Sequence, residues 1–287
     1  MLTNAVEIEN LDFCYQGTRQ PALRSVNLTI RRGEVSMLIG PTGAGKSTLY
    51  MCLNGLIPHL IQGRMSGRVT ILGADTYQHS IASLSQKVGI VFQNPEVQLF
   101  SLTVHDELAF GPENLALTRD EIFRRIDRAV TAISLTDLLE REPARLSGGQ
   151  QQTVAIGAVW AMLPDVLIMD EPTSNLDPES SLRVLKLIRK LNREHGKTIL
   201  IAEHKIDEVA HFADHVIVMN QGQIVLDGTP NEVFSQVDRL HDYGLVAPVA
   251  AEIAHRLHTN GWPIDTLPIT VADGIDVFSN LLSTSRN

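Results

Sequence analysis

Hydrophobic and polar positions in the first part of the chain predict β-strands. Residues 6–13 (VEIENLDF) alternate as the two faces of a half-buried strand do, and residues 25–30 (SVNLTI) repeat that pattern. Residues 35–39 (VSMLI) form a short, largely apolar run that leads directly into a glycine-rich loop. This third run is typical of a strand buried on both faces.

Later apolar runs alternate with helical segments. Strand patterns recur at residues 88–92, 166–169, 198–202 and 216–219, and residues 179–195 have a helical pattern. Strands that alternate with helices are typical of a parallel sheet whose two faces are covered. We therefore predict an α/β fold with a doubly wound core.

The strand pattern disappears over residues 94–163. Thr118 and Glu121 have the spacing of a capping box, and the apolar residues that follow recur at helical intervals up to Ser134. Residues 154–163 form a continuous apolar run. We interpret residues of about 94–163 as a mostly helical insertion in the α/β core.

The pattern changes again near Ser235. Beyond it, a helix is expected over residues 249–257. Its apolar positions can either contact another subunit or cover the protein's own core; they are Val249, Ile253, Ala254 and Leu257. The chain therefore divides into a main domain, residues 1–235, and a C-terminal extension, residues 236–287.

Composition argues against several classes of protein. The 287 residues are 44% hydrophobic and 20% charged, as in an ordinary globular protein, and the formal net charge of −9 argues against broad binding to nucleic acid. Cys14 and Cys52 cannot form the disulfide framework of a small secreted protein. The start of the chain lacks the pattern of a signal peptide, and residues 154–163 are shorter than the ~20 apolar residues that cross a bilayer. We expect a cytosolic protein that reaches a membrane only through a partner.

A phosphate-binding motif follows the third strand. Residues 40–47, GPTGAGKS, match G-x-x-x-x-G-K-[ST] between an expected strand and an expected helix. In such a loop the backbone N–H groups surround phosphate oxygens, the lysine reaches the outer phosphates and the final hydroxyl ligates Mg²⁺. The predicted nucleotide-binding residues are Gly40, Pro41, Thr42, Gly43, Ala44, Gly45, Lys46, Ser47 and Thr48.

Two carboxylates end a later apolar strand. Asp170, at the strand tip, can hold the same Mg²⁺, and Glu171 can polarise a water molecule for attack on the terminal phosphate. Acidic residues end strands in many proteins for other reasons. The phosphate loop upstream favours the catalytic interpretation here.

Further motifs follow in a fixed order. Gln93 follows an apolar strand, LSGGQ occupies residues 146–150, SNLD occupies residues 174–177, and His204 follows another strand. With the phosphate loop and the carboxylates, these motifs resemble an ABC-type ATPase over residues 15–204. The resemblance implies a P-loop NTPase core with a parallel-rich sheet, an antiparallel N-terminal β subdomain, an inserted α-helical subdomain and a small C-terminal extension.

The resemblance also implies roles for single residues. In ABC ATPases, the residue at the position of Tyr15 stacks on the adenine of ATP. The residue at the position of Gln93 contacts Mg²⁺ and the attacking water, and the residue at the position of His204 contacts the γ-phosphate. The LSGGQ of one subunit closes over the nucleotide on the phosphate loop of the other, so two ATP molecules lie between two subunits. Here those residues are Ser147, Gly148, Gly149 and Gln150, and Asp177 resembles the aspartate that organises the interface.

Four segments resemble the energy-coupling factor (ECF) and cobalt-type importer ATPases in particular. They are FQNPEVQLF at 92–100, TVHDELAFGPEN at 103–114, AEHKIDE at 202–208 and, in the tail, YGL at 243–245 with Pro248. In that group the segment after the glutamine forms part of a groove for helices of a membrane subunit. Leu99, Phe100 and Phe110, beside the acids Asp106 and Glu107, which we expect to be exposed, fit such docking. An amphipathic helix packed on the core is the alternative.

We therefore interpret the chain as the ATP-hydrolysing subunit of an importer for a vitamin or a transition-metal ion, at the cytoplasmic face of the cell membrane. Its partners would be a second ATPase subunit, identical or related, and two integral membrane subunits, one for coupling and one for substrate binding. The extension would help the ATPase subunits to associate, and nucleic acid would not be a partner. A soluble ABC ATPase acting on ribosomes or DNA is the alternative, although such proteins usually carry two ATPase domains or a long coiled coil. A small-molecule kinase does not account for LSGGQ.

Three residues lie outside these assignments. Thr153 stands where the family commonly has a basic residue, and this change can weaken a supporting ion pair. His211 and His215 have the spacing that chelates a metal on a helix face. Because no third ligand is apparent, we interpret both as surface histidines.

Overall fold

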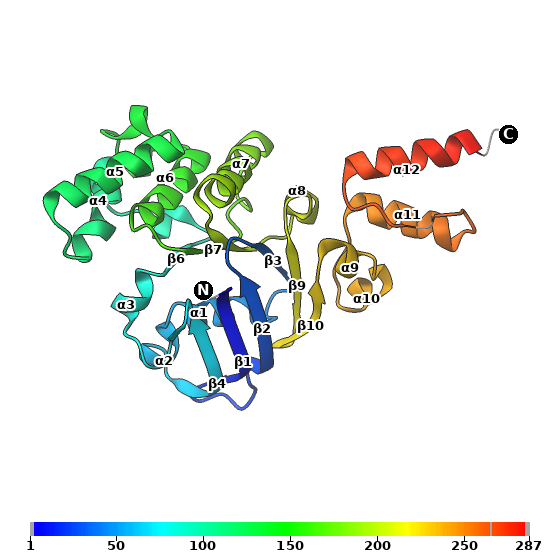
Figure 1. Cartoon of the computed structure of the whole chain (residues 1–287), viewed down its shortest axis with the longest axis horizontal. Helices are drawn as coiled ribbons and strands as arrows, with labels where there is room; N and C mark the ends of the chain where they lie inside the picture. The colour runs from blue at the N-terminus through cyan, green and yellow to red at the C-terminus, as the bar shows by residue number, and fades with distance from the viewer. Residues whose placement is uncertain (1–2, 265, 285–287) are drawn as a thin grey trace.

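A six-stranded sheet forms the centre of the protein, in the order β10-β9-β3-β8-β7-β6 (Figure 1). The structure is a computed structural model that describes residues 3–264 and 266–284, so the outermost residues of both expected domains, 1–2 and 285–287, and residue 265 lie outside the described residues. Its strands are β3 (Val35–Ile39), β6 (Val88–Val91), β7 (Val166–Asp170), β8 (Thr198–Ala202), β9 (His215–Asn220) and β10 (Gln223–Gly228). The first five are mutually parallel, as predicted, and β10 pairs antiparallel with β9.

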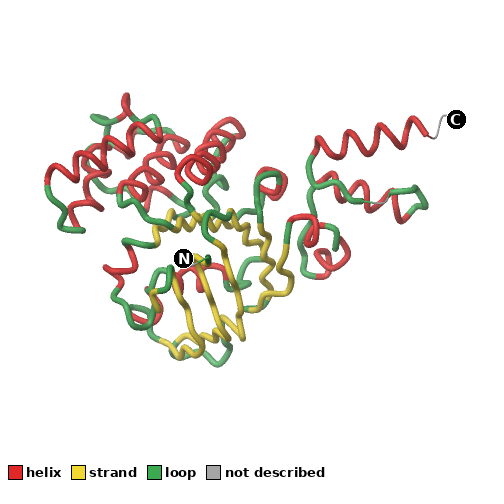
Figure 2. The backbone as a smooth tube through the Cα atoms, in the orientation of Figure 1, coloured by secondary structure: helices red, strands yellow, loops and turns green. Residues whose placement is uncertain are grey.

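A second, antiparallel sheet lies below the first in the view of Figure 2, which colours strands yellow. It has the order β2-β1-β4-β5, with β1 at Asn4–Tyr15, β2 at Leu23–Arg31, β4 at Gly63–Ile71 and β5 at Ala74–Asp75. This sheet confirms the antiparallel β subdomain. The first two strands were predicted from their alternation, whereas most of β4 is exposed or half-buried and has no such pattern.

The strands of the central sheet separate two hydrophobic layers. Val35, Met37 and Ile39 of β3 face one layer, which includes helices α6 (Gly148–Ala161) and α7 (Pro178–His195). Leu38 faces the other layer, which includes α1 (Lys46–Leu53) and the inner face of the antiparallel sheet. Because successive side chains of a strand point to opposite faces, each strand packs against both layers. The loops at the strand ends therefore lie between these two layers. The short helices α2 (Leu56–His59), α3 (Ile81–Ser85) and α8 (Ile206–Ala210) complete this part.

All of residues 94–163 are described, and they form helices and turns but no strand, as predicted. Besides α6, this part holds α4 (Val104–Asn114), α5 (Arg119–Ile133) and the 3-10 turns η1 (Pro95–Val97), η2 (Thr136–Leu138) and η3 (Pro143–Arg145). The predicted capping box of α5 is only half formed. Thr118 accepts a hydrogen bond from the Glu121 N–H, but the Glu121 carboxylate binds Arg124 and Arg125 and does not return to Thr118.

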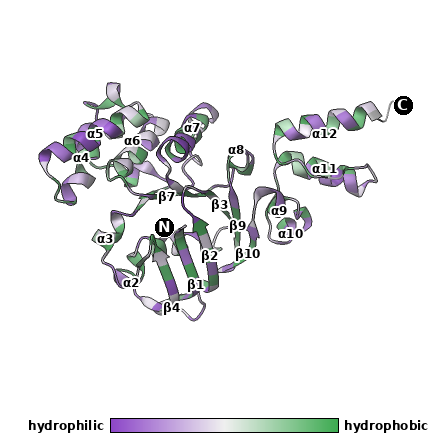
Figure 3. Ribbon diagram, viewed as in Figure 1, coloured by the Kyte–Doolittle hydropathy of each residue, from purple (hydrophilic) through white to green (hydrophobic). Residues whose placement is uncertain are grey.

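The C-terminal part is helical. Its helices are α9 (Pro230–Phe234), α10 (Val237–Asp242), α11 (Val249–Thr259) and α12 (Val271–Thr284). Helix α11 confirms the predicted helix, and α12 was not predicted. Figure 1 shows α11 and α12 side by side at the end of the molecule away from α4 and α5, and Figure 3 shows hydrophobic and hydrophilic residues alternating along α12.

Candidate active site

The phosphate loop connects β3 to α1, as expected. Gly45 caps α1 in a left-handed conformation, with φ 107°, and a Cβ at this position would lie 2.9 Å from the carbonyl oxygen of Ala22. At Gly40 a Cβ would lie 2.2 Å from the carbonyl oxygen of Met219. Both positions therefore require glycine, and the loop packs tightly against neighbouring backbone.

Lys46 lies within this loop. Its Nζ donates hydrogen bonds to the carbonyl oxygens of Gly40, at 2.6 Å, and Pro41, at 3.3 Å. Burial lowers the pKa of Lys46, and the negative charges of Glu171 and Asp170 oppose that effect. A half-buried ammonium group beside free loop N–H groups is suited to hold an anion.

The two carboxylates have different environments. Asp170 ends β7, where burial raises its pKa, the charge of Glu171 raises it further, and Lys46 opposes the shift. Glu171 has a left-handed backbone, with φ 46°, and its N–H donates to the carbonyl of Ala202 at 3.0 Å. A non-glycine residue in this conformation is held there by its surroundings.

Glu171 is held between two polar side chains. Gln93 Nε2 donates to Glu171 Oε2 at 2.9 Å, and His204 Nε2 lies 2.9 Å from Glu171 Oε1. These residues come from the ends of three adjacent parallel strands, β6, β7 and β8. Because the carboxyl ends of parallel strands meet at one edge of the sheet, residues distant in sequence converge here.

A pocket of about 590 Å³ joins these groups. Its volume is within the range of small-molecule sites. The lining residues are Tyr15, Ala22, Thr42, Gly43, Ala44, Gly45, Lys46, Ser47, Thr48, Gln93, Asp170, Glu171 and His204. Of these only Ala22 had no assigned role, because nothing in its local sequence indicates that its segment lies against the phosphate loop.

Tyr15 lies at the edge of this pocket. Its hydroxyl is 2.9 Å from the hydroxyl of Thr48, and its ring packs edge-on against Phe13, with 4.9 Å between ring centroids. These two contacts fix the ring beside the phosphate loop.

The LSGGQ residues do not line this pocket. Ser147 caps α6 and forms a full capping box with Gln150, whose Oε1 accepts from the Ser147 N–H at 3.0 Å. Gly149 packs so closely on α7 that a Cβ would lie 2.6 Å from Ser180 Oγ. Thr153, the departure from the family pattern, donates to the carbonyl of Gly149 at 2.7 Å. The signature is therefore a rigid helix start that lies outside the phosphate-loop pocket of its own chain.

Asp177 caps α7, and its side chain accepts a hydrogen bond from the Ser180 N–H at 3.0 Å. Hydrogen bonds from Ser180 lower the pKa of Asp177. Because Gly149 of the signature packs against Ser180 of α7, the helices that carry Asp177 and the signature begin close together.

The expected docking segment exposes aromatic residues. Phe100 is 64% exposed and Phe110 is 46% exposed, and their rings pack edge to face with 4.6 Å between centroids. The expectation that Glu107 is exposed is wrong. Its side chain is buried because its carboxylate accepts hydrogen bonds from the N–H groups of Phe100, at 2.9 Å, and Ser101, at 2.8 Å. Asp106 is exposed, as expected.

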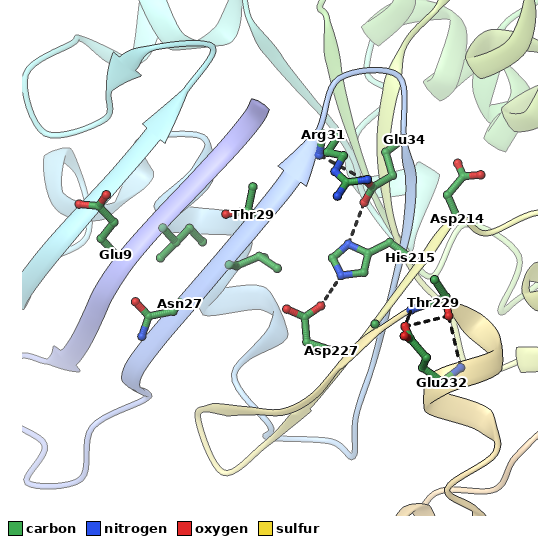
Figure 4. Close-up of a pocket in the computed structure, with 13 residues that line it drawn as sticks. Glu9, Asn27, Thr29, Arg31, Glu34, Asp214, His215, Asp227, Thr229 and Glu232 are labelled. Atoms are coloured by element: carbon green, nitrogen blue, oxygen red, sulfur yellow. Dashed lines mark hydrogen bonds and ion pairs between the residues drawn. The ribbon is translucent and has the colours of Figure 1, made fainter. Parts of the chain in front are cut away.

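A second pocket, of about 620 Å³, lies between β2 and the β9–β10 hairpin (Figure 4). His215 bridges two carboxylates there: its Nδ1 lies 2.7 Å from Glu34 Oε1, and its Nε2 contacts Asp227. Burial disfavours the charged imidazolium, but hydrogen bonds to Asp227 and Glu34 outweigh burial and raise the pKa of His215 to about 9.

The interpretation of His215 as a surface histidine is therefore wrong. Helix α8 ends before His211, and His215 begins β9. The two rings therefore do not share a helix face. Within residues 3–264 and 266–284, no three His, Cys, Asp or Glu side chains are arranged to hold a metal ion. None of the helices in the described part of the chain is long and apolar enough to cross a bilayer.

A glycine loop between a strand and a helix, with a lysine inside it and carboxylates at the end of another strand of the same sheet, defines a P-loop nucleotide site. Comparison with known proteins gives the family. Residues 23–174 match the ABC transporter family, and this chain belongs to it. It is an ATP-hydrolysing ABC ATPase of the kind coupled to transport.

The similar proteins include ATP-binding proteins of ABC transporters. The chain is 46% identical over 258 residues to a putative ABC transporter ATP-binding protein of Pyrococcus horikoshii, PH1815, covering 90% of this chain and 91% of that protein. It is 38% identical over 280 residues to the energy-coupling factor transporter ATP-binding protein EcfA of Methanothermobacter thermautotrophicus, covering 96% and 87%. Among solved structures, cbiO1 of Clostridium perfringens, described as part of the ABC transporter complex cbiONQ, superposes with a TM-score of 0.75 at 36% identity, covering 89% of this chain and 99% of cbiO1.

Proposed function

We propose that this protein is the ATP-hydrolysing subunit of an ECF-type importer for a micronutrient, a vitamin or a transition-metal ion. The observation that carries the proposal is the placement of Glu171, at the mouth of the phosphate-loop pocket and in contact with both Gln93 and His204. In this position a carboxylate can take a proton from a water molecule that attacks the terminal phosphate. His204 orients that carboxylate and reaches the γ-phosphate.

The pocket has the oxygen ligands that Mg²⁺ requires. Mg²⁺ prefers oxygen atoms and usually shares them with substrate phosphates. The hydroxyl of Ser47, the side-chain amide of Gln93 and the carboxylate of Asp170 all line the pocket and supply such atoms. These three residues would hold Mg²⁺, which neutralises developing phosphate charge when bound. Tyr15 would stack on adenine, and residues 40–48 would hold the phosphates.

The position of the signature supports a two-subunit site. Ser147, Gly148, Gly149 and Gln150 form a rigid helix start that lies outside the pocket of their own chain. A helix N-terminus favours a phosphate. We infer that these residues complete the nucleotide site of a second ATPase subunit, either another copy or a related chain.

The C-terminal extension, residues 236–287, supports association of the two subunits. Ala254 of α11 is fully buried, whereas Val249 is 56% exposed and Ile253 is 44% exposed. Helix α12 adds exposed Val271 and Ile275, one helical turn apart. Ala254 is thus buried within its own chain, and the other four positions are available to a second subunit.

The aromatic pair Phe100 and Phe110 supports docking to a membrane subunit at the cytoplasmic face of the membrane. Exposed aromatic side chains on a rigid support are frequent anchors of protein interfaces. The buried Glu107 carboxylate fixes the backbone of Phe100, so the pair is held in place before a partner binds.

Membrane recovery tests this function. Affinity-tagged protein, expressed in its native host and extracted in mild detergent, is expected to copurify with integral membrane proteins. A Phe100→Ser, Phe110→Ser variant is expected to lose them while Mg-ATP binding is unchanged, and Glu171→Gln is the matched control that keeps them. Recovery with ribosomes, unaffected by the double substitution, would contradict the proposal. If cells with the Glu171→Gln variant take up vitamins and transition-metal ions as well as cells with the wild-type protein, the micronutrient assignment would be wrong.

A further inference from the structure

Thr173 is held from two sides by the residues that flank His204. On one side, Glu203 Oε1 accepts hydrogen bonds from the Thr173 N–H, at 2.9 Å, and from the Thr173 hydroxyl, at 2.7 Å. On the other side, Lys205 Nζ donates to the carbonyl oxygen of Thr173 at 3.1 Å and to Ser181 Oγ at 3.0 Å. The polar groups of one buried threonine are thus fixed by the segment that carries the histidine.

This arrangement is buried in the protein. Thr173 is fully buried and Glu203 is only 3% exposed. Burial raises the pKa of Glu203, and the hydrogen bonds from Thr173 oppose this shift. Its second oxygen, Oε2, has no hydrogen-bond partner within the described part of the chain. A carboxylate in such a place disfavours folding compared with an apolar side chain of similar size, so its presence calls for another role.

The held threonine is directly connected to Glu171. Residues 171–174 form a tight turn, in which the N–H of Ser174 lies 3.2 Å and its hydroxyl 3.0 Å from the carbonyl oxygen of Glu171. At the start of the turn, the Glu171 carboxylate meets His204 at 2.9 Å. The segments 171–174 and 203–205 are therefore joined at two places. One is the contact between Glu171 and His204, and the other is Thr173.

We propose that Glu203 is a positioning residue for ATP hydrolysis. By holding Thr173, it fixes the distance between the 171–174 turn and the loop that carries His204, so that Glu171 keeps its left-handed backbone and its contact with the histidine. The inference rests on the proposed role of Glu171 as the base. Glu203 itself does not line the nucleotide pocket. Its removal is therefore expected to alter turnover and not nucleotide affinity.

The test compares variants of the full chain by steady-state ATP hydrolysis, Mg-ATP titration calorimetry and thermal unfolding. Glu203→Leu is expected to lower kcat by about 10- to 100-fold, the scale of a misplacement of about 1 Å at a catalytic group. Its Kd for Mg-ATP is expected to stay near the wild-type value. Glu203→Gln keeps an oxygen that accepts both hydrogen bonds from Thr173, and is expected to restore most of the lost kcat.

Matched variants separate positioning from general damage. Glu34→Leu removes another largely buried carboxylate that joins two elements, and is expected to lower Tm without lowering kcat. If Glu203→Leu does not fold, Thr173→Val removes only the hydroxyl donor and is expected to lower kcat in the same direction. In a Glu171→Gln background, either substitution is expected to add little further loss, because groups that act as a unit are not additive.

Two results would overturn the inference. One is a kcat that stays at the wild-type value in folded Glu203→Leu and Thr173→Val. The other is a loss of Mg-ATP affinity in Glu203→Leu that accounts for the whole drop in kcat/KM. Failure of the proposed function looks different, because Glu171→Gln alone would then hydrolyse ATP at the wild-type rate.

Discussion

His204 and Glu171, which follow the ends of two adjacent parallel strands, meet in the nucleotide pocket, with His204 Nε2 at 2.9 Å from Glu171 Oε1. The histidine is the more exposed partner, with 52% of its side chain accessible against 17% for Glu171. The carboxylate is therefore in contact with a more exposed side chain that lines the same pocket.

Substitution of that histidine tests the relationship. His204→Ala is expected to lower kcat for ATP hydrolysis by about 10²-fold, since orientation of the base and a phosphate contact are both lost. Phosphate release at saturating Mg-ATP measures the effect. His211→Ala is the control, because His211 is exposed and does not line the pocket. Equal rates for the two variants would show that His204 has no special role.

Lys46 is expected to carry much of the affinity for nucleotide. Lys46→Met removes the charge that reaches the phosphates and is expected to raise the Kd for Mg-ATP by about 10- to 100-fold, the scale of a hydrogen bond to a charged group. Titration calorimetry of both proteins measures this directly. A Kd within about twofold of wild type would remove the lysine from the binding site.

The His215 pair predicts a pH dependence of stability. Because the folded-state pKa of about 9 lies above the ordinary value of 6.5, the paired imidazolium stabilises the fold fully below pH 6.5 and loses this effect as pH rises through 9. His215→Gln is expected to lower Tm near pH 6, by about 2–4 °C if solvent screening leaves roughly 1 kcal/mol. Near pH 10 the difference in Tm is expected to vanish. A difference that is constant from pH 6 to pH 10 would contradict the assignment.

The signature is expected to act on the nucleotide of another subunit, which mixing experiments test. Ser147→Asp keeps a good helix cap but places a negative charge where a phosphate would bind, and Lys46→Met removes the phosphate-loop charge. Each variant alone is expected to be nearly inactive. If two copies pair, an equal mixture is expected to regain about a quarter of the wild-type rate, since half the pairs are mixed and each holds one intact site. No recovery in the mixture, or full activity of Ser147→Asp alone, would contradict pairing of two copies.

The sequence predicted the core of this fold because its strands have strong local patterns. The alternation in β1 and β2 and the apolar runs of β3, β7 and β8 each indicate a strand without reference to the rest of the chain. Strand β4 could not be found in this way, because its first six residues are half-buried or exposed and only its last three pack against the core. Helix α12 was missed because Gly274 and several polar residues interrupt its apolar stripe.

The same limit applies to the site. The phosphate-loop motif and the strand that ends in acids located the nucleotide-binding loop and the two carboxylates, and the resemblance to ABC ATPases located His204. Residues 42–48 of the loop line one pocket together with Asp170, Glu171 and His204. These patterns did not indicate that Glu107 would turn inward to bind the backbone of Phe100, or that Glu203 would bind Thr173. Both contacts join segments whose proximity follows from tertiary packing and not from local spacing.

The most direct test of the account is the fate of ATP on the Glu171→Gln variant. Glutamine keeps the size of the side chain but cannot take a proton, so we predict that the variant binds Mg-ATP with near wild-type affinity and hydrolyses it about 10²- to 10⁴-fold more slowly. Bound nucleotide, analysed after incubation, is expected to be ATP in the variant and mostly ADP in the wild type. Hydrolysis at the wild-type rate would show that Glu171 is not the base, and the role assigned to its contacts with Gln93 and His204 would be wrong.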